Sequence, residues 1–251
     1  LNTVALLKAC SKALGIGPHA AMQAAERLYL SGYLSYPRTE STAYPKSFDI
    51  QGTLQQQSSD ARWGAYVREL LIQGYTKSRG GVDMGDHPPI TPCRSASPQE
   101  LSGDMGRVYE LVVRHFIASV SHDAVWKSTK VCFEIEALGD KGKFSLSGKE
   151  LVTPGFLAVL LHKEYGDKQE DGEDYDEDEE ERQIPEFVKG ETIPLLKSNS
   201  SSGSSKVNVA TSAPVWASLD IKEKKTTPPG YLNESELIGL MEKHGIGTDA
   251  S

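Results

Sequence analysis

The sequence contains no long run of apolar residues. None of its apolar stretches approaches the roughly 18 residues that a membrane-spanning helix needs, and no secretory signal peptide is recognisable. With a mean hydropathy of −0.41, the chain is typical of a protein that folds in water. Because it starts at Leu1 instead of Met and stops at Ser251, we expect it to be part of a longer protein, so the lack of a targeting signal excludes little.

Cysteine is also scarce. The three cysteines, Cys10, Cys93 and Cys132, are far apart and form no Cys-x-x-Cys pair, which excludes the common zinc-binding and redox patterns. His115 and His122 have no Glu or Cys at metal-ligand spacing. We therefore expect reduced thiols in an intracellular protein and no metal site in this chain.

Positively charged residues are fewer than negatively charged ones. The chain has 27 Lys and Arg against 35 Asp and Glu, which gives a net charge of −8. Taken as a sum, this balance argues against a nucleic-acid-binding protein. Residues 164–181, however, hold twelve acidic residues and one lysine, a local charge of −11 that leaves +3 for the remainder. This acidic run predicts a solvated, disordered insertion. The alternative is a nucleic-acid mimic that competes for a binding groove.

Two short helices are expected in the first 32 residues. Thr3 is the predicted cap of the first helix. Pro18 is favoured at the first position of the second, which Gly32 ends. With the extended segment that follows, they predict a helix-turn-helix-like unit. The expected buried faces are Val4, Leu7, Cys10 and Leu14, then Met22, Ala25, Leu28 and Tyr29.

Directly after this unit, Tyr36 stands two residues before Arg38 in the run Gly-Tyr-Leu-Ser-Tyr-Pro-Arg-Thr-Glu-Ser from Gly32 to Ser41. A tyrosine hydroxyl has a pKa of about 10, so as a nucleophile it needs a cation that favours the phenolate and balances phosphoryl charge. Arg38 offers a planar fork that matches two phosphate oxygens. Taken alone, the pair also fits an ordinary loop with a half-buried tyrosine and a solvated arginine.

Later helices are predicted from caps and periodicity. Residues 44–59 are expected to form a loop, after which Asp60 caps a helix that Gly74 stops. Residues 97–100 read as a capping box before a helix interrupted at Gly103 and Gly106. The expected buried residues are Trp63, Val67, Leu70 and Leu71, then Val108, Leu111, Val112, His115, Phe116 and Val120.

From Trp126 the period changes to two, which predicts a strand and a hairpin turn at residues 139–142. Residues 154–161 are expected to be helical, and 192–196 and 206–218 to be strands that flank a Ser-rich linker at 198–205. A second capping box at 233–236 opens a helix that Gly245 ends. Its expected buried residues are Leu237, Ile238 and Met241.

The run Arg27-Leu28-Tyr29 with Gly32 to Ser41 resembles the active-site segment of type IA DNA topoisomerases. In that family the tyrosine that matches Tyr36 attacks a single strand and keeps its 5′-phosphate, while the arginine that matches Arg38 steadies the phosphoryl group. A second resemblance is Asp-His-Pro-Pro-Ile-Thr-Pro at 86–92, where His87 lies 51 residues after Tyr36. The family has a His-containing motif at about this spacing, which implies that His87 donates to a phosphate oxygen.

A third resemblance is Gly-Ile-Gly-Thr-Asp-Ala-Ser at 245–251, a turn that lies in the strand-binding groove of the family. The sequences of these motifs are most similar to those of eukaryotic topoisomerase III, the beta branch in particular. The resemblance implies a catalytic set and a strand-binding set. These are Tyr36, Arg38 and His87, and Ser35, Thr39 and Thr248.

The predicted fold class is α+β. Residues 1–122 are expected to form a helical domain that carries Tyr36 on a CAP-like helix-turn-helix unit. Residues 123–226 are expected to form a β-rich arch with the acidic and Ser-rich insertions, and 227–251 the truncated start of a helical strand-binding domain. The arch and the strand-binding domain are implied by the resemblance.

The resemblance implies ATP-independent cleavage, strand passage and religation, with relaxation of negative supercoils, and the chain has no Walker motif. It also implies Mg²⁺ bound by a Toprim domain that this chain lacks, so the chain alone is expected to be inactive. Expected partners are single-stranded DNA, with RNA and proteins left open, and the expected location is nuclear, with a cytoplasmic pool open. Alternatives are a non-catalytic helix-turn-helix module that binds single strands and a tyrosine recombinase, which attaches to the 3′ side.

Overall fold

The computed structural model describes residues 1–77, 80–160, 184, 187–190, 192, 225–226 and 228–247. They divide into two compact units, each taken by itself below. The described part of the first unit is 1–77, 80–125, 152–160 and 231–247, and that of the second is 126–151, 184, 187–190, 192, 225–226 and 228–230. The acidic run, the Ser-rich linker, the strand expected at 206–218, most of that at 192–196, and Thr248 lie outside the described residues.

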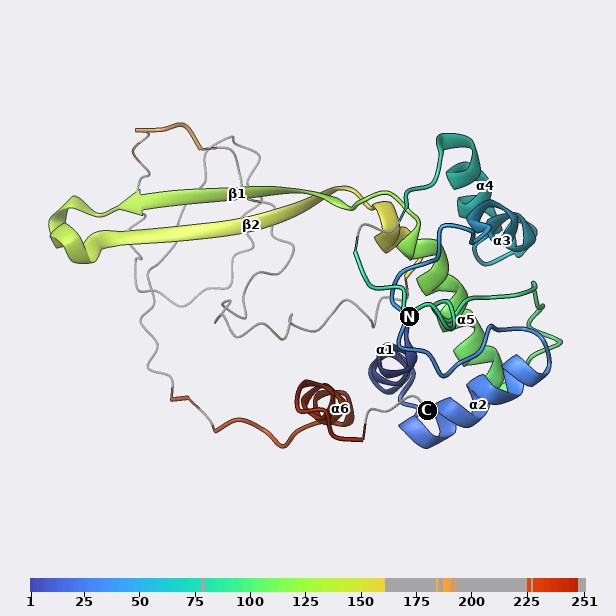
Figure 1. Ribbon diagram of the computed structural model, residues 1–251. Coiled ribbons are helices and arrows are strands. Elements are labelled where there is room, and N and C mark those ends of the chain that lie inside the picture. Colours follow the sequence, from blue (N-terminus) through green and yellow to red (C-terminus); the bar gives the residue numbers. More distant parts are fainter. Residues whose placement is uncertain are drawn as a thin grey trace, which may run out of the picture. The chain divides into compact units, whose positions relative to one another are not determined.

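The structure is a mixture of helices and one two-stranded sheet, so the α+β class is confirmed (Figure 1). The helices are α1 (Thr3–Ala9), which continues into a π-helical turn (Cys10–Leu14), α2 (Pro18–Leu30), α3 (Ile50–Gln57), α4 (Gly64–Gln73), α5 (Gly103–Ser119) and α6 (Glu234–Lys243). The strands are β1 (Val125–Glu134) and β2 (Lys143–Thr153), with 3₁₀ turns at Glu136–Gly142 and Gly155–Ala158. Among the described residues, no helix is long and apolar enough to cross a membrane.

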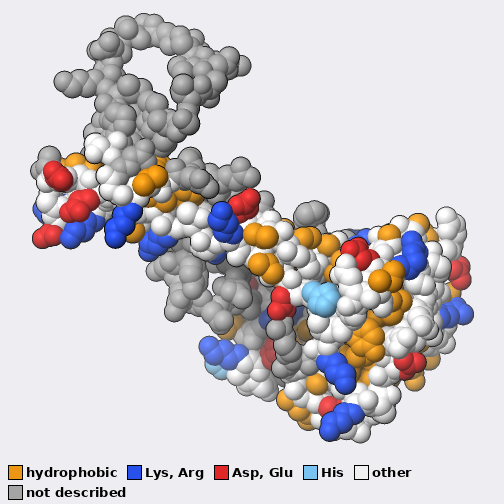
Figure 2. All heavy atoms as spheres, turned by 90° about the horizontal axis from the view of Figure 1, so that it is seen from above, with side chains coloured by type: hydrophobic (Ala, Val, Ile, Leu, Met, Phe, Trp, Pro, Cys, Tyr) orange, Lys and Arg blue, Asp and Glu red, His pale blue; other side chains and the backbone are white. Residues whose placement is uncertain are grey.

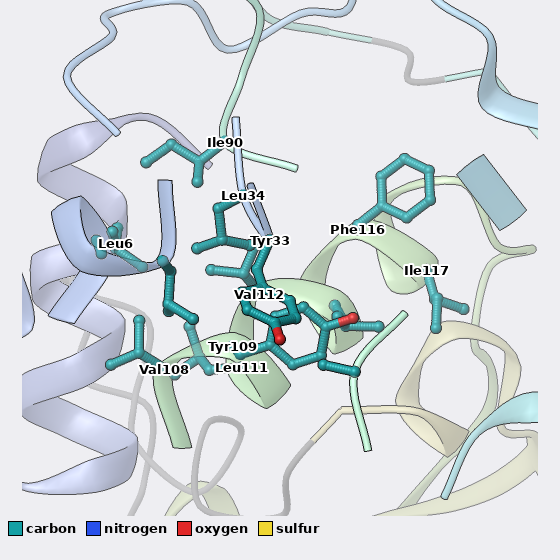
Figure 3. Packing of buried hydrophobic residues seen from close by; sticks show 14 of the residues in the cluster. Leu6, Tyr33, Leu34, Ile90, Val108, Tyr109, Leu111, Val112, Phe116 and Ile117 are labelled. Atoms are coloured by element: carbon teal, nitrogen blue, oxygen red, sulfur yellow. The ribbon is translucent and has the colours of Figure 1, made fainter. Parts of the chain in front are cut away.

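The core of the first unit lies around α5, against which α2 packs (Figure 1). The buried face that periodicity predicts for α5 is confirmed, with His115 only half-buried, and the structure adds Tyr109, Val113 and Ile117. Figure 3 shows Leu34 between Ile90 and the side chains of α5, with Tyr33 close to Tyr109. The segment that carries Tyr36 is therefore anchored on the central helix through the two residues that follow Gly32.

The predicted cap of the first helix and part of the predicted buried faces are wrong. Asn2, not Thr3, caps α1, because its side chain accepts a hydrogen bond from the Ala5 N–H. Cys10 is buried as predicted, but packing also buries Leu6 and Ala13, while the expected Val4, Leu7 and Leu14 are only half-buried. In α2, Ala25 and Leu28 are buried as predicted, together with Ala21 and Ala24, and Met22 is half-buried.

Helix α3 lies in the stretch that was expected to be a loop. Asp49 caps it by accepting a hydrogen bond from the Gly52 N–H. Its sequence is Ile-Gln-Gly-Thr-Leu-Gln-Gln-Gln, which buries only Leu54 and Gln57, so no apolar period identifies it. The Gln57 amide is satisfied inside the core, since its oxygen accepts from Trp63 Nε1 at 3.3 Å.

Helix α4 has the predicted buried face but not the predicted cap. It begins at Gly64 with Trp63 as cap residue, and Gly74 ends it at a φ of +96°. Trp63, Val67 and Leu70 are buried, while Leu71 is half-buried. The Asp60 side chain accepts a hydrogen bond from the Arg62 guanidinium and does not cap the helix.

The capping box predicted at residues 97–100 forms only as a local turn. Glu100 accepts a hydrogen bond from the Ser97 N–H at 2.7 Å, but α5 begins at Gly103, which has a φ of +59°. From Gly103 the helix runs without interruption through Gly106. Gly106 lies against the Leu101 carbonyl, where a Cβ would come within 2.7 Å, so it is required by close packing and does not break the helix.

The second unit contains the predicted hairpin. β1 and β2 form a two-stranded sheet, and Gly139 adopts a φ of +53° in the turn. In β1, Val131 and Phe133 are half-buried while their neighbours are exposed, as the period of two predicts. Phe133 contacts Phe187 edge to face at 5.4 Å.

The capping box of α6 is confirmed, because Asn233 and Glu236 bond each other's backbone. Its predicted buried face is wrong, since α6 has no buried residue and Leu237 is 49% exposed. The helix lies against α1, where Ser11 Oγ donates to Glu234 at 3.1 Å. Among the described residues, α6 packs mainly against α1 and the π-helical turn Cys10–Leu14, and Leu237 and Leu240 stay exposed.

An ionic network surrounds the buried Trp63. Arg62 bonds Asp60 at 2.7 Å and Glu110 at 3.0 Å, and its guanidinium lies 4.0 Å from the Trp63 ring centre. Burial alone would raise the pKa of Asp60, but hydrogen bonds from Arg62, with the charges of Arg62 and Arg114, hold that pKa below its ordinary 3.8. The folded state therefore favours the ionised carboxylate.

Asp60→Asn is expected to lower the free energy of unfolding by about 1–3 kcal/mol at pH 7, because Arg62 loses one of its two charged partners. The folded pKa lies below the unfolded one, so this stabilisation exists above the unfolded pKa and is lost as pH falls through the folded pKa. Urea unfolding of both proteins between pH 7 and about pH 2 measures it. The difference should disappear in acid; a difference independent of pH would contradict the role of charge. Asp104→Asn, whose side chain is 53% exposed, is the control.

Candidate active site

The tyrosine segment begins where α2 ends. Gly32 takes a φ of +75° that suits a residue without a side chain, and the Tyr33 N–H donates to the Leu28 carbonyl at 2.8 Å. The predicted stop at Gly32 and the predicted start at Pro18 are both confirmed. The chain then leaves the helix in an extended conformation, with Tyr33 and Leu34 buried.

A distant segment pairs with this extended stretch. The Ser35 N–H donates to the Thr91 carbonyl at 2.9 Å, and the Cys93 N–H donates to the Tyr33 carbonyl at 2.8 Å. Leu34 and Pro92 form an antiparallel bridge. These backbone bonds join residues 33–35 to residues 91–93, so the two motifs of the resemblance lie together in the fold.

The Ser35 side chain strengthens this pairing. Its hydroxyl oxygen accepts from the Thr91 N–H at 2.9 Å and donates to the Pro89 carbonyl at 3.3 Å. Ser35, predicted to bind nucleic acid, therefore has a structural task at a half-buried position. Its contact with a strand stays a prediction.

Thr3, at the start of α1, hydrogen-bonds the backbone of residues that follow Tyr36. Its N–H donates to the Thr39 carbonyl at 3.0 Å, and its hydroxyl accepts from the Thr39 N–H at 2.9 Å and lies 2.9 Å from the Pro37 carbonyl. The buried Thr39 hydroxyl donates to the His87 carbonyl at 3.2 Å. Thr39, also predicted to contact nucleic acid, lies 1% exposed among these bonds, and that contact stays a prediction.

Exposure alternates along this segment. Pro37, Thr39 and Ser41 are buried, whereas Tyr36 before Pro37 and Arg38 after it are half-buried. Tyr36 contacts Tyr29 and Arg38 contacts Glu26, and both of these partners lie on one face of α2. Tyr36 and Arg38 are therefore presented on one common outer face beside α2.

The Tyr36 ring lies between two other rings. His87 is 4.7 Å away between ring centres at a tilt of 50°, and Tyr29 of α2 is 5.2 Å away at 71°. His87 is exposed on its loop, and its backbone N–H donates to the Asp86 side chain at 2.7 Å. The structure thus brings Tyr36 and His87 together. The prediction that Tyr29 is buried is wrong, because it is 41% exposed.

Arg38 is held by Glu26 of α2. Its Nε and Nη2 donate to one oxygen of the Glu26 carboxylate at 3.1 and 2.7 Å, and both side chains are about two-fifths exposed, at 39% and 40%. Sequence reasoning missed Glu26 and Tyr29 as site residues. A signal was present, since they are three residues apart and so share one face of α2.

No metal cluster accompanies the site in the described part of the chain. On the face seen in Figure 2, Lys and Arg side chains of the described residues are scattered among Asp and Glu. Within the described part of the chain, no group of three or more His, Cys, Asp or Glu side chains could hold a metal ion. These residues therefore do not fit a Mg²⁺ site, and no chemical step below involves a metal.

Fold and site together define a mixed α and β protein that presents a tyrosine and an arginine on one outer face beside a histidine. The chain belongs to the DNA topoisomerase family, whose model, described as "DNA topoisomerase", matches residues 1–251.

The curated relatives agree with this assignment. The chain is 42% identical over 251 residues to human "DNA topoisomerase 3-beta-1" and 43% identical to "DNA topoisomerase 3-beta" of Arabidopsis thaliana. All of the chain is covered, but only 25% and 24% of those proteins, so it spans about a quarter of their length. The fold is similar to that of full-length topoisomerase I from Thermotoga maritima, with a TM-score of 0.62, 19% identity, and coverage of 100% of this chain and 36% of that one.

Ser35→Ala is expected to lower the free energy of unfolding of this chain by about 1–3 kcal/mol, because the Thr91 N–H loses its acceptor at a half-buried position. Chemical denaturation measures the change. Ser31→Ala, at an exposed position at the end of α2, is the matched control and should change stability by less than about 0.5 kcal/mol. Equal stabilities for both variants would mean that the Ser35 hydroxyl does not hold the two segments together.

Proposed function

We propose that this chain is the central part of a type IA topoisomerase, which cleaves and religates one nucleic-acid strand through a 5′-phosphotyrosine at Tyr36. The supporting observation is the common outer face of Tyr36 and Arg38, with His87 4.7 Å from the Tyr36 ring, in a chain of the DNA topoisomerase family. Strand passage through the transient break would relax negative supercoils. In this proposal residues 1–122 are the tyrosine domain with a CAP-like unit, 123–226 the arch, and 227–251 the start of a strand-binding domain.

The proposed step is a transesterification. The Tyr36 oxygen attacks the phosphorus, a tyrosyl phosphoester bond forms, and the bond to the 3′-oxygen of the neighbouring nucleotide breaks; the phenolic proton leaves Tyr36 and the released 3′-oxygen takes up a proton. Religation is the reverse attack by the 3′-hydroxyl. One phosphoester bond replaces another, so ATP is not consumed.

Arg38 and His87 have distinct tasks in this step. The Arg38 guanidinium stays charged at any working pH and donates to phosphoryl oxygens that gain charge in the transition state. His87 donates to a phosphate oxygen next to the Tyr36 ring. Ser35 and Thr39 are proposed strand contacts, as is Thr248.

A non-catalytic single-strand-binding module is the weaker alternative. Such a module would give no role to the close approach of Tyr36 and His87, whose ring centres are 4.7 Å apart. The relatives, too, are named as topoisomerases. The catalytic proposal therefore accounts for more of the chain.

Mg²⁺ is proposed to bind carboxylates of a Toprim domain outside this chain, where it would supply charge neutralisation at the phosphates. The chain by itself would then be inactive. The proposed substrate is single-stranded DNA, with RNA as a second substrate and protein partners to be found. A nuclear location, with a cytoplasmic pool, is proposed on the same basis.

Tyr36→Phe in the full-length protein is expected to abolish the covalent adduct while strand affinity stays within about threefold, because only the attacking oxygen is removed. Labelled single-stranded DNA, trapped with protein on denaturing gels, reports the adduct, and equilibrium binding reports affinity. Tyr29→Phe, which keeps the neighbouring ring, is the control and should still form adduct. Adduct in the Tyr36→Phe protein would contradict the assignment.

Arg38→Lys is expected to slow cleavage and religation by roughly 10- to 1000-fold, the range for loss of one transition-state contact. Lysine keeps the charge but cannot donate from a planar fork. Single-turnover rates of adduct formation and resealing measure the effect. Rates close to wild type would remove Arg38 from the proposed mechanism.

A further inference from the structure

Helix α2 contacts both members of the tyrosine–arginine pair. Tyr29 packs edge to face on Tyr36 at 5.2 Å, and Glu26 binds Arg38 at 2.7 and 3.1 Å. Glu26 and Tyr29 are three residues apart, so they lie on one face of the helix, about one turn from each other. A single rigid element therefore positions the two side chains that the proposed chemistry uses.

The contact with Glu26 uses only part of the Arg38 guanidinium. Nε and Nη2 donate to one carboxylate oxygen, and a guanidinium has five N–H donors. Three donors, on Nη1 and Nη2, are left for phosphoryl oxygens. Glu26 can thus hold one edge of the group while the other end meets the strand.

The pair also matters little for the fold. Both side chains are about two-fifths exposed, at 39% and 40%, and ion pairs at such positions stabilise folded proteins only slightly. An arginine side chain has many rotamers, so an exposed one without a fixed partner would occupy its productive geometry for a small part of the time. The contact is therefore better explained by orientation of Arg38 than by stability.

We propose that Glu26 is a positioning residue that holds the guanidinium of Arg38 in the orientation required at the scissile phosphate. The proposal rests on the proposed function of Tyr36 and Arg38. It differs from a competitive arrangement, in which the carboxylate would occupy Arg38 until a strand displaced it. The two arrangements give opposite signs when Glu26 is removed.

The test uses the full-length protein with Glu26→Ala and Glu26→Gln. Glu26→Ala should slow single-turnover cleavage about 10- to 100-fold, since orientation is lost. Strand affinity, measured in the Tyr36→Phe background, should stay within about threefold, because one exposed charge changes little. Glu26→Gln, whose amide oxygen still accepts from Nε and Nη2, should recover most of the rate. The control Glu69→Ala removes a carboxylate on α4 that accepts from Gln73 and should cleave like wild type.

A double-mutant cycle separates positioning from a general structural effect. Adding Glu26→Ala to Arg38→Ala should cause no further loss of cleavage rate, because the orienting contact has nothing left to orient. Glu26→Leu, which keeps side-chain bulk, replaces the alanine variant should that one melt at a lower temperature. A further loss in the double variant would overturn the proposal.

The remaining outcomes are also decisive. Faster cleavage or much tighter strand binding in Glu26→Ala would establish competition and overturn the positioning role. An unchanged cleavage rate, or a loss confined to strand affinity, would also overturn the positioning role. Failure of the proposed function has a different signature, since the wild-type protein itself would then form no adduct. Adduct in wild type with equal rates in Glu26→Ala would overturn the inference on Glu26 alone.

Discussion

The site depends on the pairing of two chain segments far apart in the sequence. Residues 33–35 and 91–93 exchange backbone hydrogen bonds of 2.8 to 2.9 Å, and the Ser35 hydroxyl bonds the Thr91 N–H and the Pro89 carbonyl. This pairing fixes the loop of His87 beside Tyr36. Without it the two rings would belong to independent loops, and no common site would exist.

A second constraint acts on the backbone around Arg38. Thr3 bonds both the N–H and the carbonyl of Thr39, and its hydroxyl oxygen lies 2.9 Å from the Pro37 carbonyl. These bonds tie the backbone on either side of Arg38 to the start of α1. Helix α2 then contacts both half-buried side chains, Tyr36 through Tyr29 and Arg38 through Glu26.

The sequence predicted the features that local chemistry determines. Pro18 and Gly32 mark the ends of α2, periodicity predicted the buried face of α5, and the cap of α6 and the hairpin were found. It failed where tertiary packing decides. Helix α3 has too few apolar residues for a period. The spacing of Glu26 and Tyr29 indicates a shared helix face, but it does not identify Arg38, twelve residues away on another element, as the partner of Glu26.

The polarity of the covalent adduct tests the central claim most directly. A single strand labelled at its 5′ end in one sample and at its 3′ end in another is cleaved by the full-length protein, and the protein-bound label is identified on denaturing gels, with the attached residue located by peptide mass spectrometry. Attack by Tyr36 with retention of the 5′-phosphate predicts that only the 3′-labelled fragment stays bound, through Tyr36. A bound 5′-labelled fragment, attachment through another residue, or no adduct at all would contradict the account.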